Sequence, residues 1–287
     1  EMHKVLHGDR VMVREIGVDR RGRPEGSIVE VLERANSRLV GRLYSEHGIL
    51  FVVAENKRIS QDILLLPGAD MGAVPGQVVT VEIVEQPSRY AQPIGRVVEV
   101  LGGYTDPGME IEIALRKHNL PYVFPSEVAE VAAKLPKKVL KKELKGREDV
   151  RHLPLVTIDG ETARDFDDAV YCEPQGKGYK LFVAIADVSH YVRHGETLDR
   201  EALNRGNSVY FPRRVIPMLP EELSNGLCSL NPEVDRLCMV CEMDITGGGS
   251  IKKYRFYPAV MHSHARLTYT QVAAALSDPE GGIGRGL

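Results

Sequence analysis

Apolar and polar positions alternate through the first 103 residues. Short runs rich in valine and isoleucine recur between glycine-bearing turns, a spacing typical of small antiparallel β-barrels. These runs are residues 10–16, 27–32, 39–43, 49–53, 78–84 and 95–101. The pattern predicts that residues 1–37 are the end of a first barrel, so that the chain begins inside a domain, and that residues 38–103 form a second barrel.

The pattern changes to a helical period between residues 104 and 150. Ser126 follows Pro125 and precedes apolar residues spaced three and four apart, which predicts an amphipathic helix that ends before Pro136. A run of lysines accompanies it: Lys134, Lys137, Lys138, Lys141, Lys142 and Lys145. Such a run is either a solvated surface or a stripe of phosphate contacts. We therefore predict a helical, lysine-rich connector.

Residues 151–287 mix strand and helix patterns. The apolar run 179–192 predicts a central strand, and Thr197 and Gly206 mark the start and end of a helix. Residues 247–250, Gly-Gly-Gly-Ser, predict a hairpin turn, and Thr268 with Gln271 predicts a capping box. The glycine-rich stretch 277–287 predicts a flexible tail, with the remainder of this domain missing from the chain.

Composition narrows the class of protein. Hydrophobic residues make up 43% of the chain, enough for buried cores, and the net charge is −3 with 37 basic and 40 acidic residues. This balance argues against a uniformly basic nucleic-acid-binding surface but permits local basic grooves. No apolar run is long enough to cross a bilayer, so we expect no membrane association and a cytoplasmic protein. Cys238 and Cys241 form a C-x-x-C pair, read as buried structural thiols with zinc or redox chemistry as the alternative.

Four aspartates fall within ten residues: Asp159, Asp165, Asp167 and Asp168. Apolar runs flank them, so we expect Asp159 to end one strand and the other three to begin the next. Carboxylates crowded in this way repel one another and call for a counter-charge, for which a hard divalent cation such as Mg²⁺ is best suited. One or two such ions would support phosphodiester hydrolysis. The stretch therefore predicts a metal-dependent enzyme.

Two other interpretations of the acidic stretch stay open. It could be an acidic turn in water, which the apolar flanks disfavour. It also invites comparison with the loop of aspartyl-phosphate phosphatases, in which the nucleophilic aspartate directly follows a buried strand. Here the strand leads into Asp159, and Glu-Thr-Ala-Arg precedes Asp165, which disfavours a phosphatase.

Several long stretches resemble the ribonuclease II and ribonuclease R family of exoribonucleases. They are residues 155–170, which contain the four aspartates, and residues 183–192, 208–230, 237–243 and 263–269. The resemblance implies small cold-shock or OB-type β-barrels followed by part of a mixed α/β RNB catalytic domain. It implies processive, hydrolytic, 3′-to-5′ degradation of RNA to nucleoside 5′-monophosphates by metal-assisted attack of water. The implied partners are Mg²⁺ and single-stranded RNA or RNA with a 3′ overhang, with ribosome-associated RNA as a further substrate and a monomer as the assembly.

The resemblance also implies roles for individual residues. The four aspartates would be catalytic and hold the metal, with Asp167 most directly tied to catalysis, and Tyr210 would stack on the terminal nucleotide. Weaker assignments, each with an ordinary structural alternative, are phosphate contacts by Arg213 and Arg214, base stacking by Tyr44 and Phe51, and backbone guidance by Arg42, Lys57 and Arg58. Asp187 and His190 could support the site or simply satisfy the fold. Family members continue with the rest of the catalytic domain and a further RNA-binding domain, so an inactive RNA-binding fragment is the alternative.

Overall fold

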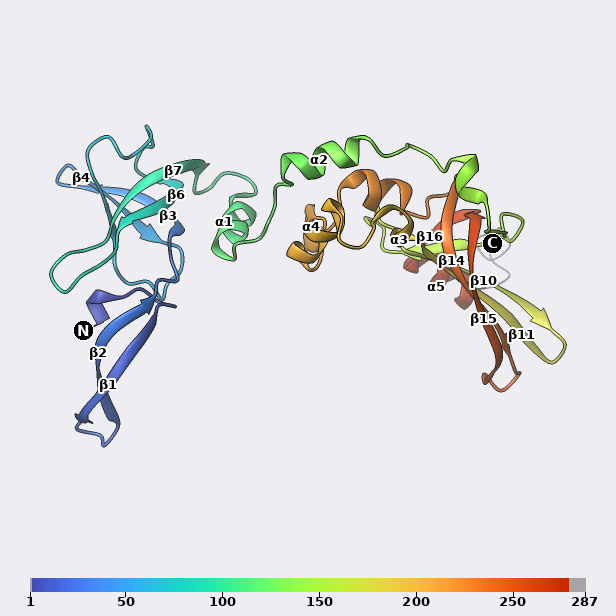
Figure 1. Cartoon of the computed structure of the whole chain (residues 1–287), viewed down its shortest axis with the longest axis horizontal. Coiled ribbons are helices and arrows are strands. Elements are labelled where there is room, and N and C mark those ends of the chain that lie inside the picture. Colours follow the sequence, from blue (N-terminus) through green and yellow to red (C-terminus); the bar gives the residue numbers. More distant parts are fainter. Residues whose placement is uncertain (1, 279–287) are drawn as a thin grey trace. The chain divides into compact units, whose positions relative to one another are not determined.

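The structure is a computed structural model that describes residues 2–278, and the chain divides into two compact units, Glu1–Tyr122 and Val123–Leu287 (Figure 1). From residue 279 onward, the predicted flexible tail lies outside the described residues. Within residues 2–278, no helix is long and apolar enough to span a bilayer.

Unit 1 contains a closed five-stranded barrel, which confirms the predicted OB-type architecture. Its strands are β3 (Arg38–Glu46), β4 (Ile49–Ala54), β5 (Ile63–Leu65), β6 (Gln77–Glu85) and β7 (Ile94–Gly103), joined in the order β3-β4-β5-β7-β6. Leu43, Val52 and Ile63 point into the core and are fully buried. A Cβ at Gly41 would lie 2.4 Å from the carbonyl oxygen of Val53, so glycine lets β3 and β4 approach closely. The three-residue strand β5 is too short to stand out in the sequence pattern.

A long hairpin precedes the barrel. A short 3₁₀ turn, η1 (Met2–Lys4), leads into β1 (Arg10–Val18) and β2 (Pro24–Glu33), which form a two-stranded antiparallel sheet of their own. Most hairpin side chains are exposed. Leu6 is buried against the barrel core and fastens the start of the chain to it.

The predicted connector over residues 104–150 divides between the two units. Helix α1 (Met109–Lys117) packs on β3 and β7 of the barrel through Met109. Helix α2 (Ser126–Ala133) packs on α4 in unit 2. Each helix has an apolar side, and each buries it on the nearest core, so the two do not form a separate linker. The N-cap of α2 is Pro125, and Ser126 is its first helical residue.

A seven-stranded mixed sheet organises unit 2, in the order β16-β9-β10-β11-β14-β15-β8. Its central strands are antiparallel: β9 (Val156–Asp159), β10 (Asp168–Gln175), β11 (Gly178–Ala186), β14 (Asp235–Ile245) and β15 (Ile251–His262). The short strands β8 (Glu148–Asp149) and β16 (Ala265–Thr268) pair in parallel at the edges. The predicted turn 247–250 joins β14 and β15.

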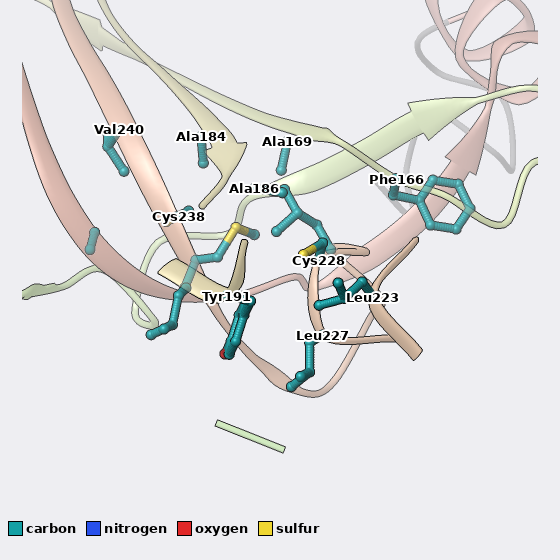
Figure 2. Close-up of a cluster of buried hydrophobic side chains, with 14 of the residues drawn as sticks. Phe166, Ala169, Ala184, Ala186, Tyr191, Leu223, Leu227, Cys228, Cys238 and Val240 are labelled. Carbon is teal, nitrogen blue, oxygen red and sulfur yellow. The ribbon is translucent and has the colours of Figure 1, made fainter. Parts of the chain in front are cut away.

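The core of unit 2 lies on one face of this sheet. Alanines at Ala169, Ala184 and Ala186 leave space on the strands, which larger side chains fill from the covering segments (Figure 2). Tyr191 and Leu227 are among these covering side chains. They come from α3 (Val188–Tyr191) and from η3 (Glu222–Leu227), a π-helical turn.

Several local predictions can be compared with the structure. The strand predicted over residues 179–192 ends at Ala186, because the backbone turns into α3 after Asp187. Helix α4 (Thr197–Arg205) ends at Gly206, which adopts a φ of +73° as a C-cap, although Thr197 is its first residue rather than its cap. The capping box of Thr268 and Gln271 is confirmed and starts α5 (Tyr269–Ser277).

The four cysteines are free. Cys228 and Cys238 are buried, and burial raises the pKa of each thiol to about 12. Cys238 and Cys241 are three positions apart on β14, so their side chains point to opposite faces of the sheet. The C-x-x-C pair therefore consists of structural thiols and is neither a chelating nor a redox pair.

Candidate active site

The acidic loop joins β9 to β10 at one end of the sheet. Asp159 is the last residue of β9 and Asp168 is the first of β10. Because the two strands are antiparallel neighbours, the end of one lies beside the start of the other. Asp165 and Asp167 precede β10 and belong to the loop, so the prediction that they begin the strand with Asp168 is wrong.

Phe166 anchors the loop between these two aspartates. Its side chain is buried in the core of unit 2 (Figure 2). Asp167, in contrast, is exposed. The backbone N–H of Phe166 donates to Oγ of Ser229 at 3.0 Å, and its carbonyl accepts from the N–H of Leu230 at 2.8 Å. The Ser229 hydroxyl in turn donates to the carbonyl of Arg164 at 2.9 Å. With Phe166 held inward, its neighbours Asp165 and Asp167 stay at least partly accessible to solvent.

The pKa of the Asp167 carboxyl is raised by its crowded surroundings. Loss of hydration raises its pKa first, and the charges of Asp165, Asp168 and Asp159 raise it further. Solvent still reaches the side chain, so this is a strained surface charge and not a buried one. Among the described residues, the charges that shift this pKa are like charges, with no cation that offsets them. Such perturbed carboxyls concentrate at functional sites.

Tyr210 joins the site from a separate hairpin. It is the central residue of β12 (Val209–Phe211), which pairs with β13 (Arg214–Ile216). Its hydroxyl donates to Oδ2 of Asp165 at 2.5 Å. This hydrogen bond, together with reduced hydration, raises the pKa of Tyr210 to about 12, because a phenolate would face the carboxylate without a proton between them. The ring itself is 62% exposed, so it is a surface platform and not a core side chain.

The donor set of the acidic loop suits a hard cation. All four candidate ligands are carboxylates, the oxygen ligands that Mg²⁺ prefers, and their mutual repulsion is what a divalent ion would relieve. Within residues 2–278, no three acidic, histidine or cysteine side chains already converge on a single point. Mg²⁺ usually takes only a few protein carboxylates and fills its remaining positions with water and phosphate, so a preformed cage of protein ligands is not required.

Arg266 and Ser229 support the loop, and sequence reasoning missed both. The Arg266 guanidinium donates to the carbonyls of Glu161 and Ala163, at 3.1 and 2.9 Å, and lies 4.7 Å from the centre of the Phe166 ring. Both residues lie inside stretches that carry the family resemblance, residues 208–230 and 263–269. Their distance from the aspartates along the chain concealed their role.

Asp187 and His190 belong to a partly buried ionic network beside the core. Burial would raise the pKa of Asp187, but hydrogen bonds from Arg147 and Ser189 outweigh it, so the pKa is lowered. Arg147 Nη2 lies 2.5 Å from Asp187 Oδ2, and His190 Nε2 lies 3.1 Å from Glu143 Oε1. These contacts hold η2 (Lys141–Leu144) against α3 and hold Arg147 at the end of β11, so they account for Asp187 and His190 structurally.

The remaining candidates lie on the surfaces of their own units. In unit 1, Tyr44 and Phe51 face each other across β3 and β4 as a stacked pair, with ring centres 5.9 Å apart, and Arg42 lies over the rings of Tyr44 and Tyr104. In unit 2, Arg213 is exposed in the turn between β12 and β13, where Arg214 begins β13. The six lysines of residues 134–145 are solvent-accessible and, among the described residues, none is paired with a carboxylate.

Three parts of the chain match known protein families. Residues 147–282 match the RNB domain, residues 51–125 match the cold shock domain, and residues 1–31 match the ribonuclease B OB domain. Ribonuclease R of Escherichia coli strain K12 is 56% identical over 273 residues, which are 95% of this chain and 34% of that protein. The chain thus spans about a third of the length of this curated relative.

Solved structures give the same picture. Mycoplasma genitalium RNase R in complex with ribose-methylated single-stranded RNA superposes with a TM-score of 0.88 at 30% identity, over 97% of this chain and 44% of that one. The same enzyme in complex with double-stranded RNA gives a TM-score of 0.83 at 31% identity, over 93% of this chain and 47% of that one.

Proposed function

Because the chain belongs to the RNB family of ribonucleases, we propose that it contributes the acidic half of the active site of a 3′-to-5′ exoribonuclease that hydrolyses RNA processively to nucleoside 5′-monophosphates. The observation that carries this proposal is the pairing of a crowded carboxylate loop with the exposed ring of Tyr210, hydrogen-bonded to that loop. An aromatic platform beside a cation-binding loop suits the end of a single RNA strand.

Each residue has a distinct task in this proposal. Asp159, Asp165, Asp167 and Asp168 would hold one or two magnesium ions. When bound, magnesium would supply Lewis-acid stabilisation of the phosphate and lower the pKa of water. The Tyr210 ring would stack on the terminal base, which contributes about 1–3 kcal/mol without reading sequence. Its hydroxyl would hold Asp165 in place, while Phe166, Ser229 and Arg266 keep the loop in position.

The proposed substrate is single-stranded RNA or RNA with a 3′ overhang. Mycoplasma genitalium RNase R was captured with single-stranded and with double-stranded RNA. This chain carries exposed basic and aromatic side chains that could contact RNA. Tyr44, Phe51 and Arg42 on the barrel would bind bases and backbone, and Arg213 and Arg214 would contact phosphate near Tyr210. Binding to ribosome-associated RNA and a monomeric state remain predictions from the family. We also propose cytoplasmic residence, with which the four free cysteines agree.

A direct test uses 5′-labelled single-stranded RNA, the 287-residue chain and Mg²⁺, with chelator and an Asp167→Asn variant as controls. The proposal predicts stepwise shortening from the 3′ end and release of nucleoside 5′-monophosphates, abolished by either control. RNA that is bound but stays intact would favour the alternative that this chain binds RNA without cutting it. Phosphate trapped on Asp165 would favour an aspartyl-phosphate phosphatase, although Asp165 lies in a loop and not directly after β9.

A further inference from the structure

An open cavity in unit 1 is bordered by residues that carry basic or amide groups. Its volume is about 450 Å³, and its lining residues are His7, Asn56, Lys57, Arg58, Lys117 and His118. No carboxylate lines it. The residues come from three separate segments of unit 1: the stretch after η1, the loop between β4 and β5, and the end of α1. None of them belongs to the acidic loop, which is part of unit 2.

Among the described residues, no cation of this cavity forms an ion pair with a carboxylate, whereas a neighbouring arginine of the same unit does. Arg116 forms ion pairs with Glu99 and Glu112. The next residue, Lys117, has no carboxylate partner in the part of the chain that the structure describes, and neither has Lys57. The Arg58 guanidinium contacts another basic group, with Nη1 3.4 Å from Nε2 of His7. The chain has 40 acidic and 37 basic residues, so a shortage of carboxylates does not explain why these cations have no carboxylate partner.

The walls of the cavity are preformed, because each segment is anchored by a buried neighbour. Ile59 is buried directly after Arg58, and the N–H of Arg58 donates to Oδ1 of Asn56 at 3.2 Å, which makes a tight turn that presents the two cations. His7 follows buried Leu6. Leu115 is fully buried two positions before Lys117. A fixed backbone lowers the entropy lost when a ligand orders these side chains.

We propose that this cavity binds phosphate groups. Lys57, Arg58 and Lys117 supply three positive charges, and two imidazoles can donate hydrogen bonds. This set suits an anion that carries several oxygens. The volume lies in the range of ligand pockets and exceeds that of one phosphate. No phenylalanine, tyrosine or tryptophan lines it, and its cationic side chains suit phosphate better than a base. Recognition would therefore be through phosphate and independent of sequence.

The natural source of the phosphates is the RNA backbone. This choice of source rests on the proposed function, whereas the choice of phosphate rests on the cavity alone. The C-terminal end of α1 favours positive charge by its helix dipole, which explains Lys117 and His118 without a ligand. It does not explain why Lys57 and Arg58 converge on the same cavity from the β4–β5 loop. A phosphate between the two segments would account for both.

The experiment measures binding of three probes by the full chain at several salt concentrations: inorganic tripolyphosphate, ADP and a 2′-O-methyl oligonucleotide that resists cleavage. The test variants are Arg58→Glu and the double variant Lys57→Gln with Lys117→Gln. The matched control is Arg20→Glu, the same charge change on an exposed residue of the β1–β2 turn. Thermal unfolding of every variant confirms that the barrel is intact.

The proposal expects each test variant to weaken oligonucleotide binding at least about tenfold and to reduce the slope of log affinity against log salt by about 0.7 for each phosphate that the variant no longer neutralises. Arg20→Glu should change little. Parallel weakening of tripolyphosphate and ADP binding identifies a general phosphate site, and weakening of oligonucleotide binding alone identifies the RNA backbone. If the test variants bind every probe as well as the parent, or if Arg20→Glu weakens binding equally, the cavity is not a phosphate site. None of these readouts requires cleavage, so they stand or fall separately from the proposed nuclease.

Discussion

The hydroxyl of Tyr210 donates a 2.5 Å hydrogen bond to Asp165, 45 positions earlier in the chain. In the proposed function, one side chain would thus have two separable roles: its exposed ring would stack on a base, and its hydroxyl would hold Asp165. The hydrogen bond keeps its proton through the neutral range, because the pKa of Tyr210 is about 12.

Separating the two functions of Tyr210 gives the first prediction. Tyr210→Phe keeps the ring and removes the donor, so RNA affinity should stay within about twofold of the parent while the metal concentration needed for turnover rises. Tyr210→Ala removes the ring as well and should weaken RNA binding by about 1–3 kcal/mol. Fluorescence anisotropy with a cleavage-resistant oligonucleotide measures the RNA affinity of both variants, and cleavage at several Mg²⁺ concentrations measures the metal requirement. Equal losses of affinity in the two variants would mean that the ring does not stack on RNA.

The second prediction concerns Asp167. Asp167→Asn removes one charge from the crowded loop, so it should abolish cleavage, leave RNA binding nearly intact and raise the unfolding midpoint in chelator on the order of 1–2 °C. The raised pKa of Asp167 gives the sign: the charged form is disfavoured in the folded state, so removing the charge stabilises the fold without metal. Calorimetry with and without Mg²⁺ measures this. A variant less stable than the parent in chelator would contradict the crowding argument.

Ser229 should set the rigidity of the acidic loop. Its buried hydroxyl accepts from Phe166 and donates to Arg164, so Ser229→Ala leaves a buried backbone N–H without its partner and should cost about 1–3 kcal/mol. Hydrogen exchange at the Phe166 amide should accelerate. Ser224→Ala is the matched control, since the Ser224 hydroxyl donates a long hydrogen bond, 3.4 Å, to the carbonyl of Pro220. Unchanged exchange at Phe166 in the Ser229 variant would show that other contacts hold the loop.

The ion pair of Arg147 and Asp187 should make stability sensitive to acid. Because the folded-state pKa of Asp187 is lowered, its contribution is fully present above the ordinary value of 3.8 and is lost as pH falls below it. Asp187→Asn leaves Arg147 charged and unpaired in a partly buried site, so it should cost about 3–5 kcal/mol at pH 7. Denaturant unfolding at pH 7 and pH 3 measures both proteins. The difference should shrink at pH 3, and a constant difference would exclude titration of Asp187 as its source.

The local sequence pattern predicts most of the strands and helices and part of the candidate site. Alternation predicts the barrel strands because their inner faces are buried, and the Thr268 capping box is visible because both partners lie within four residues. Strand β5 escapes detection because three residues give no period. The turn after Ala186 escapes because an apolar sequence is equally compatible with a strand and with the buried side of a helix.

The site itself divides in the same way. The four aspartates can be predicted as a site from sequence, because carboxylates so close together along the chain must repel one another. Ser229 and Arg266 act on that loop from 63 positions or more away in the chain, through contacts with backbone atoms that any loop sequence would present. Only the fold shows that these residues meet.

The contacts of Glu143 and Arg147 have a consequence for the lysine-rich stretch beside them. A stretch with six lysines would ordinarily be an easy target for trypsin and an easy place to splice in a tether. Here Glu143 within the stretch is held by His190 of α3, and Arg147 just after it is held by Asp187. Replacing residues 134–145 with a glycine-serine spacer would therefore remove one of these two anchors, while β8 would keep its pairing with β15.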